Sequence, residues 1–128
     1  MEYMKQYEIL VKKAKDDYNT AKLVFNNIEN SNIDIALFHL QQAVEKSLKA
    51  LLVFNKIEFP KTHKLDILID ILTENNVKLE ISKELIVLNE YAVEARYDYI
   101  GEIFDDFTTI AIKVQELIEN IEKMVGII

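Results

Sequence analysis

The chain has 128 residues, half of them apolar, with no cysteine and a formal net charge of −7. This length can bury a core without cross-links, and the lack of cysteine excludes disulfides and thiolate metal sites. We expect a single domain over residues 1–128. Because phosphate contacts dominate nucleic-acid affinity, so acidic a chain is a poor general nucleic-acid binder.

Membrane insertion and export have no support in the sequence. The longest apolar runs, such as Ala50–Phe54, have five residues, whereas a bilayer-spanning helix needs about 20. The amino-terminal residues show no signal-peptide pattern, so we expect a cytoplasmic protein without membrane contact. Two glycines and one proline leave few turns, which favours long helices over a many-stranded sheet.

An apolar seam with alternating spacings of four and three residues predicts a first helix over about 3–28. Residues that favour caps and turns interrupt the pattern over 26–32. A second helix is predicted from Ser31 or Asn32 to about Asn55, with Asp34 in the first turn, where negative charge suits the helix dipole. The buried positions expected in these two helices are Tyr7, Val11, Ala14, Tyr18, Ala21, Phe25 and Ile28, then Ala36, Leu40, Ala43, Val44, Ser47 and Leu51.

The rest of the chain predicts three further helices. Pro60 prevents the second helix from continuing, and Thr62 is expected to cap a third helix over about 63–74. Ser82 is expected to cap a fourth helix over about 83–97, and Asp105 or Asp106 to open a fifth that reaches 124. Their expected buried positions are Leu65, Leu68, Ile69 and Leu72, then Leu85, Leu88, Ala92 and Ala95, then Phe107, Ile110, Val114, Leu117, Ile121 and Met124.

These patterns predict an all-α fold, a five-helix up-and-down antiparallel bundle. The first and last helices also carry apolar residues outside their seams. One bundle of this size does not cover them all, so we expect a homodimer. The extra apolar residues are Ile9, Leu10, Leu23, Ile112 and Ile118.

A polar stripe on the second helix is the first candidate site. His39, Gln42, Lys46 and Lys49 follow one another at spacings of three, four and three, which places them on one helix face. Histidine titrates near neutrality, glutamine both donates and accepts, and lysine suits phosphate. The segment 36–64 holds five lysines against two glutamates, a local charge of +3 that fits an anionic ligand such as a nucleotide or RNA. The alternative is a solvated face with an incidental histidine.

Two further residues stand out beyond this stripe. His63 follows Thr62 at the predicted start of the third helix, where free N–H groups make a natural anion site. The alternative for His63 is packing over Phe59 and Pro60. Arg96, the only arginine, can pair with phosphate in bidentate fashion or form a structural ion pair. The complete set of ligand-binding candidates is His39, Gln42, Lys46, Thr62, His63 and Arg96.

Several common chemistries lack their residues. The two glycines are 25 residues apart, which excludes a glycine-rich phosphate loop. The sequence has no HExxH motif, and its two histidines are 24 residues apart. Ser47 has no evident base beside it, so a nucleophilic triad has no support. We therefore predict neither a metal site nor a cofactor.

Three segments together resemble the HEPN domain, whose name stands for higher eukaryotes and prokaryotes nucleotide-binding. They are ALFHLQQAVEKSLKALL at 36–52, PKTHKL at 60–65 and ARY at 95–97. The resemblance covers the whole chain and implies a helical bundle that pairs as a homodimer. It also implies a companion role to a minimal nucleotidyltransferase, in pairs that resemble toxin–antitoxin modules.

Many HEPN proteins are metal-independent endoribonucleases, in which an arginine is followed after four to six residues by a histidine. Here the corresponding positions after Arg96 hold Gly101, Glu102 and Ile103. The resemblance therefore implies a binding module for a nucleotide or a nucleotidyltransferase partner. The first alternative is a ribonuclease toxin that uses Arg96 with His39 or His63, and the second is a purely structural dimerising bundle.

Overall fold

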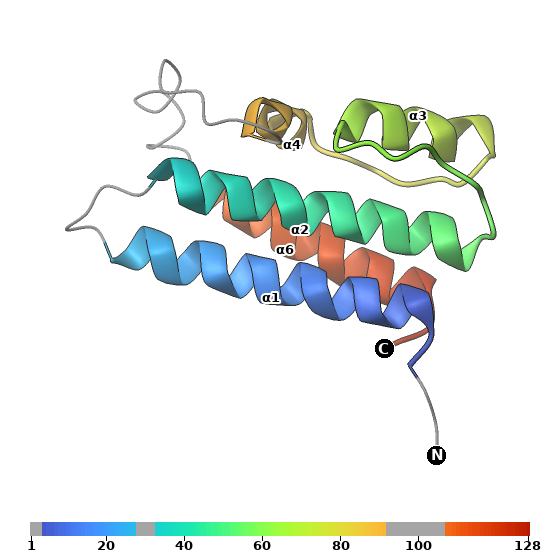
Figure 1. Cartoon of the computed structure of the whole chain (residues 1–128), viewed down its shortest axis with the longest axis horizontal. Coiled ribbons are helices and arrows are strands. Elements are labelled where there is room, and N and C mark those ends of the chain that lie inside the picture. The colour runs from blue at the N-terminus through green and yellow to red at the C-terminus, as the bar shows by residue number, and fades with distance from the viewer. Residues whose placement is uncertain (1–3, 28–32, 92–106) are drawn as a thin grey trace.

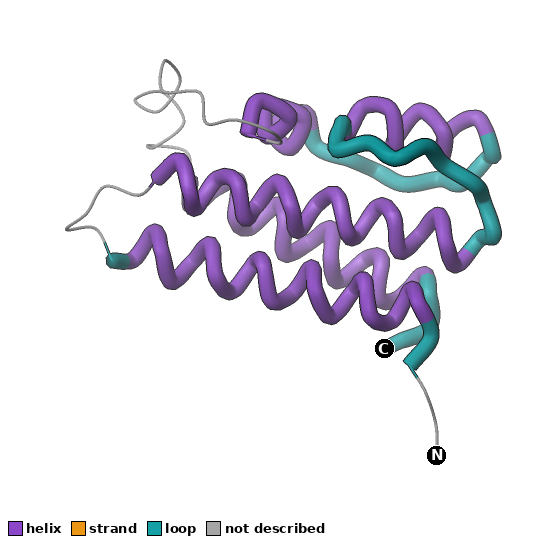
Figure 2. The backbone as a smooth tube through the Cα atoms, in the orientation of Figure 1, coloured by secondary structure: helices purple, strands orange, loops and turns teal. Residues whose placement is uncertain are grey.

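A computed structural model describes residues 4–27, 33–91 and 107–128 of the chain. All regular secondary structure within these ranges is helical, as Figure 2 shows, so the predicted all-α bundle is confirmed. The helices are α1 (Gln6–Asn26), α2 (Ile33–Phe54), α3 (Leu65–Glu74), α4 (Lys83–Ile86), the 3-10 helix η2 (Val87–Tyr91) and α6 (Phe107–Met124).

Helix α2 lies at the centre of the molecule (Figure 1). Helices α1 and α6 pack beside it, whereas α3 and α4 lie across α2 from α1. Two aromatic pairs show that α1 runs antiparallel to both of its neighbours. Tyr7 meets Phe54 at the end of α2 edge-on, with ring centroids 5.1 Å apart, and Phe25 stacks on Phe107 at the start of α6 at 4.0 Å.

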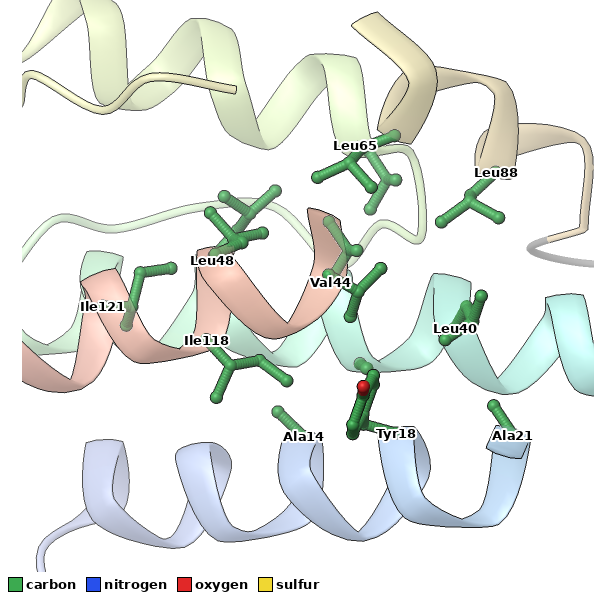
Figure 3. Close-up of a cluster of buried hydrophobic side chains, with 14 of the residues drawn as sticks. Ala14, Tyr18, Ala21, Leu40, Val44, Leu48, Leu65, Leu88, Ile118 and Ile121 are labelled. Atoms are coloured by element: carbon green, nitrogen blue, oxygen red, sulfur yellow. The ribbon is translucent and has the colours of Figure 1, made fainter. Parts of the chain in front are cut away.

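The core surrounds α2 on several sides (Figure 3). A helix covered on only one face needs a single apolar stripe, but a helix between two layers must be apolar over most of its circumference. The run 36–52 meets this requirement. Twelve of its seventeen residues are buried, and the other five are Phe38 and four partly buried polar residues, His39, Gln42, Lys46 and Lys49. The fully buried apolar side chains of α2 are Ala36, Leu37, Leu40, Ala43, Val44, Leu48, Ala50, Leu51 and Leu52.

Most predicted seam positions in the described residues are buried, and the exceptions lie near the ends of α1 and α6 and in the middle of α3. Tyr7, Phe25 and Ile69 are only partly buried, and Met124 at the end of α6 is exposed. Ile118, expected outside the seam, is buried beside Ala14 of α1. Because α6 packs against both α1 and α2, its buried face is broader than one seam. The predicted core positions Ile28, Ala92 and Ala95 lie outside the described residues.

The start of α3 differs from the prediction. This helix begins at Leu65, two residues later than expected, and the Oγ1 of Thr62 accepts the Lys64 N–H instead of capping the helix. The Leu65 N–H donates to Oδ1 of Asn89 in η2 at 2.6 Å, so the cap comes from a distant element. The predicted fourth helix also differs over its described part, because α4 ends at Ile86 and the 3-10 helix η2 follows. The rest of its predicted range, 92–97, lies outside the described residues.

The connection between α2 and α3 positions the candidate site. Lys56 adopts a left-handed conformation with φ 58°, and the Ile57 N–H donates to the Leu52 carbonyl at 3.0 Å, which ends α2 and reverses the chain. Residues 55–64 then run back along α2 (Figure 2). As a result, His63 lies beside the middle of α2.

Candidate functional site

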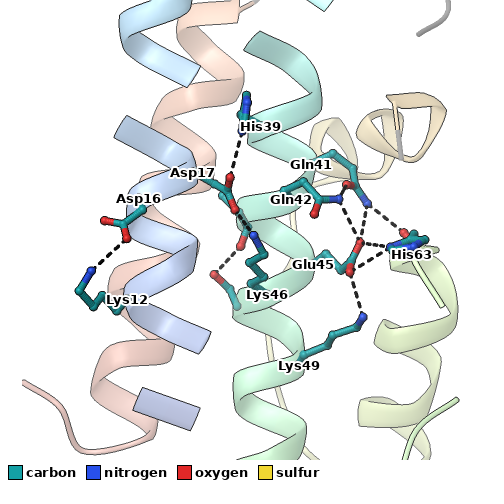
Figure 4. Close-up of polar contacts among 12 residues, drawn as sticks. Lys12, Asp16, Asp17, His39, Gln41, Gln42, Glu45, Lys46, Lys49 and His63 are labelled. Atoms are coloured by element: carbon teal, nitrogen blue, oxygen red, sulfur yellow. Dashed lines mark hydrogen bonds and ion pairs between the residues drawn. The ribbon is translucent and has the colours of Figure 1, made fainter. Parts of the chain in front are cut away.

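Polar side chains of α2 form two separate clusters around carboxylates, one toward α1 and one toward α3 (Figure 4). In the first cluster, Asp17 of α1 contacts both His39 and Lys46. The His39 Nδ1 lies 2.9 Å from one oxygen of Asp17, and the Lys46 Nζ donates to the other at 2.5 Å. The Asp17 side chain is only 13% exposed, so its carboxylate has lost most of its water and the contacts with His39 and Lys46 replace it.

In the second cluster, Glu45 is the central acceptor. Its side chain is 5% exposed and receives Lys49 Nζ at 2.9 Å and His63 Nδ1 at 3.1 Å. The amides of Gln41 and Gln42 donate to the same carboxylate at 3.3 and 3.4 Å. A buried carboxylate is tolerated only where donors replace its water shell, and four side chains do so here.

Gln41 is fully buried and ties the connection to α2. Its Nε2 donates to the backbone carbonyl of His63 at 2.9 Å, and its Oε1 accepts from Gln42 Nε2 at 2.7 Å. Gln42 therefore holds the amide of Gln41 in place. Lys49 reinforces the same arrangement, because its ammonium group lies 5.9 Å from the ring centroid of Phe59 in the connection.

His63 is the exposed member of the second cluster. Its side chain is 58% exposed, and within the described part of the chain only its Nδ1 has a partner. Because His63 precedes α3, it is not the first-turn residue that the sequence predicted. Fewer free N–H groups remain at this helix start than expected, because the N–H of Leu65 already donates to Asn89.

The charge of the segment 36–64 is distributed unevenly. Lys46 and Lys49 are paired with Asp17 and Glu45, whereas Lys56, Lys61 and Lys64 are exposed and have no ion pair with any described residue. Within the described residues, the positive charge that the sequence assigned to 36–64 as a whole is therefore left without a partner only in the connection that carries His63.

The structure brings the predicted site residues together only in part. His39 and Lys46 share one carboxylate, while Gln42 and His63 belong to the network around Glu45. The side chain of Thr62 makes only the local bond to Lys64 among described residues. Arg96 lies outside the described residues, as do positions 101–103.

Sequence reasoning missed three residues that organise these clusters. Gln41 and Glu45 stand four residues apart within an apolar helix, a spacing that could have indicated a buried polar pair. Asp17 gives no such signal, because it lies in a run of charged residues on α1, KKAKDD, that is typical of a solvated face.

Two clefts elsewhere on the surface do not involve these clusters. One of about 470 Å³ lies between α6 and the residues around the start of α4, lined by Glu80, Ser82, Lys113, Glu116 and Asn120 among others. A second of about 270 Å³ lies beside α1 and includes Lys15 and the buried Glu122, which form an ion pair at 2.9 Å.

Two negative findings apply to residues 4–27, 33–91 and 107–128. No three histidine, aspartate or glutamate side chains there are grouped in a way that could hold a metal ion. None of the helices in the same ranges has both the length and the apolar character needed to cross a bilayer.

The sequence of this helical bundle matches a known family. The HEPN domain family matches residues 7–127, and the chain therefore belongs to the HEPN domain family. A curated relative from Methanocaldococcus jannaschii, named Putative toxin MJ1304, is 25% identical over 111 residues, which cover 80% of this chain and 71% of the relative. No solved structure gives a significant match.

Proposed function

We propose that this HEPN protein is a binding module that recognises a nucleotide, a nucleotidyltransferase partner, or both, in a pair of the toxin–antitoxin type. The observation that carries the nucleotide part is the exposed His63 in a connection with three lysines that form no ion pair with a described residue. Family membership supports the bundle as a scaffold for this role, and the name of the archaeal relative supports the toxin–antitoxin setting.

We assign the ligand contacts to cationic side chains that do not already have a carboxylate partner. An incoming phosphate would have to compete with Asp17 for Lys46 and His39, which disfavours that cluster as the anion site. Lys61, His63 and Lys64 have no such competitor among the described residues apart from the contact of His63 Nδ1 with Glu45. We therefore place the phosphate at the connection, with Arg96 as a further candidate on sequence grounds.

The proposal is tested by calorimetric titration of the full chain with nucleoside mono-, di- and triphosphates and with a minimal nucleotidyltransferase. We expect binding of at least one, and a Kd about tenfold higher in a Lys61→Ala, Lys64→Ala double variant, because charge-assisted contacts are lost. Lys12→Ala on α1 is the control and should bind as the unchanged chain does. Absence of heat with all of these partners would refute the proposal.

A ribonuclease toxin is the second candidate function, because each histidine is paired with a carboxylate. A histidine held by a carboxylate is the arrangement used by general bases, and Arg96 would stabilise charge on the reacting phosphate. In this case expression of the chain should be toxic, and the toxicity should disappear with Arg96→Ala. Harmless overexpression without cleavage of cellular RNA would exclude this function.

A further inference from the structure

Gln41 and Glu45 are buried polar side chains of α2 whose bonds to described residues outside that helix all go to His63. Burial of an amide and a carboxylate opposes folding unless hydrogen bonds replace the lost water. Gln41 reaches the backbone carbonyl of His63 at 2.9 Å, and Glu45 reaches its Nδ1 at 3.1 Å. Two buried groups thus hold the backbone and the ring of one exposed histidine.

This double contact determines which ring nitrogen of His63 is available. An ionised carboxylate can only accept hydrogen bonds, so the ring donates from Nδ1 to Glu45. In the neutral ring Nε2 is then an acceptor, and in the protonated ring Nε2–H is a donor. The first form suits a ribose hydroxyl and the second a phosphate oxygen, so a nucleotide offers a partner to either form.

His39 also contacts a carboxylate through Nδ1, but its surroundings differ. Its partner Asp17 is shared with Lys46 and comes from another long helix, so the contact joins α1 to α2. The ring of His39 is also less exposed than that of His63 and lies edge-on to Phe38, with centroids 5.4 Å apart. The buried pair Gln41 and Glu45 has no counterpart at His39 among the described residues.

We propose that Gln41 and Glu45 are positioning residues for His63, which hold its ring so that Nε2 contacts the bound nucleotide. This inference rests on the nucleotide binding proposed above. It names the histidine that meets the ligand, and it gives a reason for placing two polar side chains in the core of α2.

The first test is spectroscopic and needs no ligand. Nitrogen-15 NMR of the imidazole rings, at a pH where they are neutral, should show His63 in the Nδ1–H form. Glu45→Met replaces the carboxylate with a thioether, a weak and uncharged acceptor, and should abolish this preference at His63 while leaving His39 unchanged. Asp17→Asn is the matched control and should leave His63 unchanged. If Glu45→Met does not fold, Gln41→Met is measured instead and should increase the motion of the His63 ring.

The second test adds ATP to the same labelled samples. We expect the Nε2 resonance of His63 to shift and that of His39 to stay constant. The Kd for ATP should rise about tenfold in Glu45→Met, and Asp17→Asn should bind ATP as the unchanged chain does.

The possible failures are distinguishable. Heat on titration of ATP without a shift at His63, or a shift at His39 alone, would overturn this inference and leave the proposed function standing. A His63 tautomer that does not depend on Glu45 would overturn it as well. Absence of heat with every nucleotide and with the nucleotidyltransferase would overturn both proposals together.

Discussion

Neighbouring residues of the same type can have different roles, as Asp16 and Asp17 show. Asp16 forms an exposed pair with Lys12 one turn away on α1, and such pairs contribute little to stability. Asp17 is largely buried between α1 and α2 and contacts both His39 and Lys46. Only its position relative to α2 separates the two aspartates.

Substitution of these two aspartates tests this difference at the residue scale. Asp17→Asn should lower the free energy of unfolding by about 2 kcal/mol, because two half-buried donors lose an anionic partner. Asp16→Asn should change it by less than about 0.5 kcal/mol. Urea unfolding followed by circular dichroism measures both, and equal effects would contradict the assigned role of Asp17.

At the scale of elements, three helices end in the same way. Lys56, Asn76 and Gly126 follow α2, α3 and α6 with φ of 58°, 61° and 76°. In each case the next N–H bonds to a carbonyl five residues earlier, at 3.0, 2.9 and 2.9 Å. Left-handed backbone favours glycine and tolerates asparagine, so Lys56 is the residue least suited to its conformation.

Lys56→Gly should therefore stabilise the protein. We expect the free energy of unfolding to rise by about 0.5–1 kcal/mol, since the relief of backbone strain exceeds the added entropy of the unfolded chain. Lys56→Ala removes the same charge but keeps the Cβ atom, and it should leave stability close to that of the unchanged chain. Thermal unfolding compares the two variants. A gain with alanine as large as with glycine would contradict the explanation.

Elements also constrain each other at the start of α3. Asn89 in η2 accepts the Leu65 N–H and donates to Asp66 at 3.1 Å, which joins two helices that are separate in the sequence. Loss of this cap by Asn89→Ala should lower the free energy of unfolding by about 1 kcal/mol and speed hydrogen exchange of the Leu65 amide. Asn120→Ala, at an exposed position of α6, is the control. Unchanged exchange at Leu65 would count against the capping role.

For the whole molecule, the exposed apolar residues bear on its assembly. Of the residues expected outside the seams, Ile118 is buried and Leu10 is half-buried, so they belong to the monomer. Leu23 and Ile112 remain 72% and 51% exposed on α1 and α6, and Ile9 is also exposed. Fewer exposed apolar residues therefore support a homodimer than the sequence indicated, and those that remain lie on α1 and α6.

We expect light scattering at tens of micromolar to give twice the chain mass of 14.9 kDa. Leu23→Glu and Ile112→Glu should shift the mass toward the monomer, because a charge would be buried in the interface. Lys12→Glu changes an exposed residue of α1 that is already charged and should leave the mass unchanged. A monomeric mass for the unchanged chain would refute the homodimer.

The sequence by itself determined the helical class, the order of the helices and most of the core. Apolar periodicity is a local property, so residues such as Val11, Ala14 and Ala21 could be assigned to the interior without knowledge of their partners. It also located the segment around His39 and His63 as the richest in candidate chemistry. The sequence could not show how the two histidines differ in exposure and in partners, because both are followed by residues that fit an amphipathic helix.

Only the tertiary structure decided which polar residues belong together. Asp17 and His39 are 22 residues apart, and Glu45 and His63 are 18 apart, so their pairing depends on how α1 and the α2–α3 connection pack against α2. The cap of α3 by Asn89 likewise depends on packing, which is why its start was misplaced from local signals. Local patterns therefore determined what is buried, and the packing of α2 between two layers decided which histidine faces solvent.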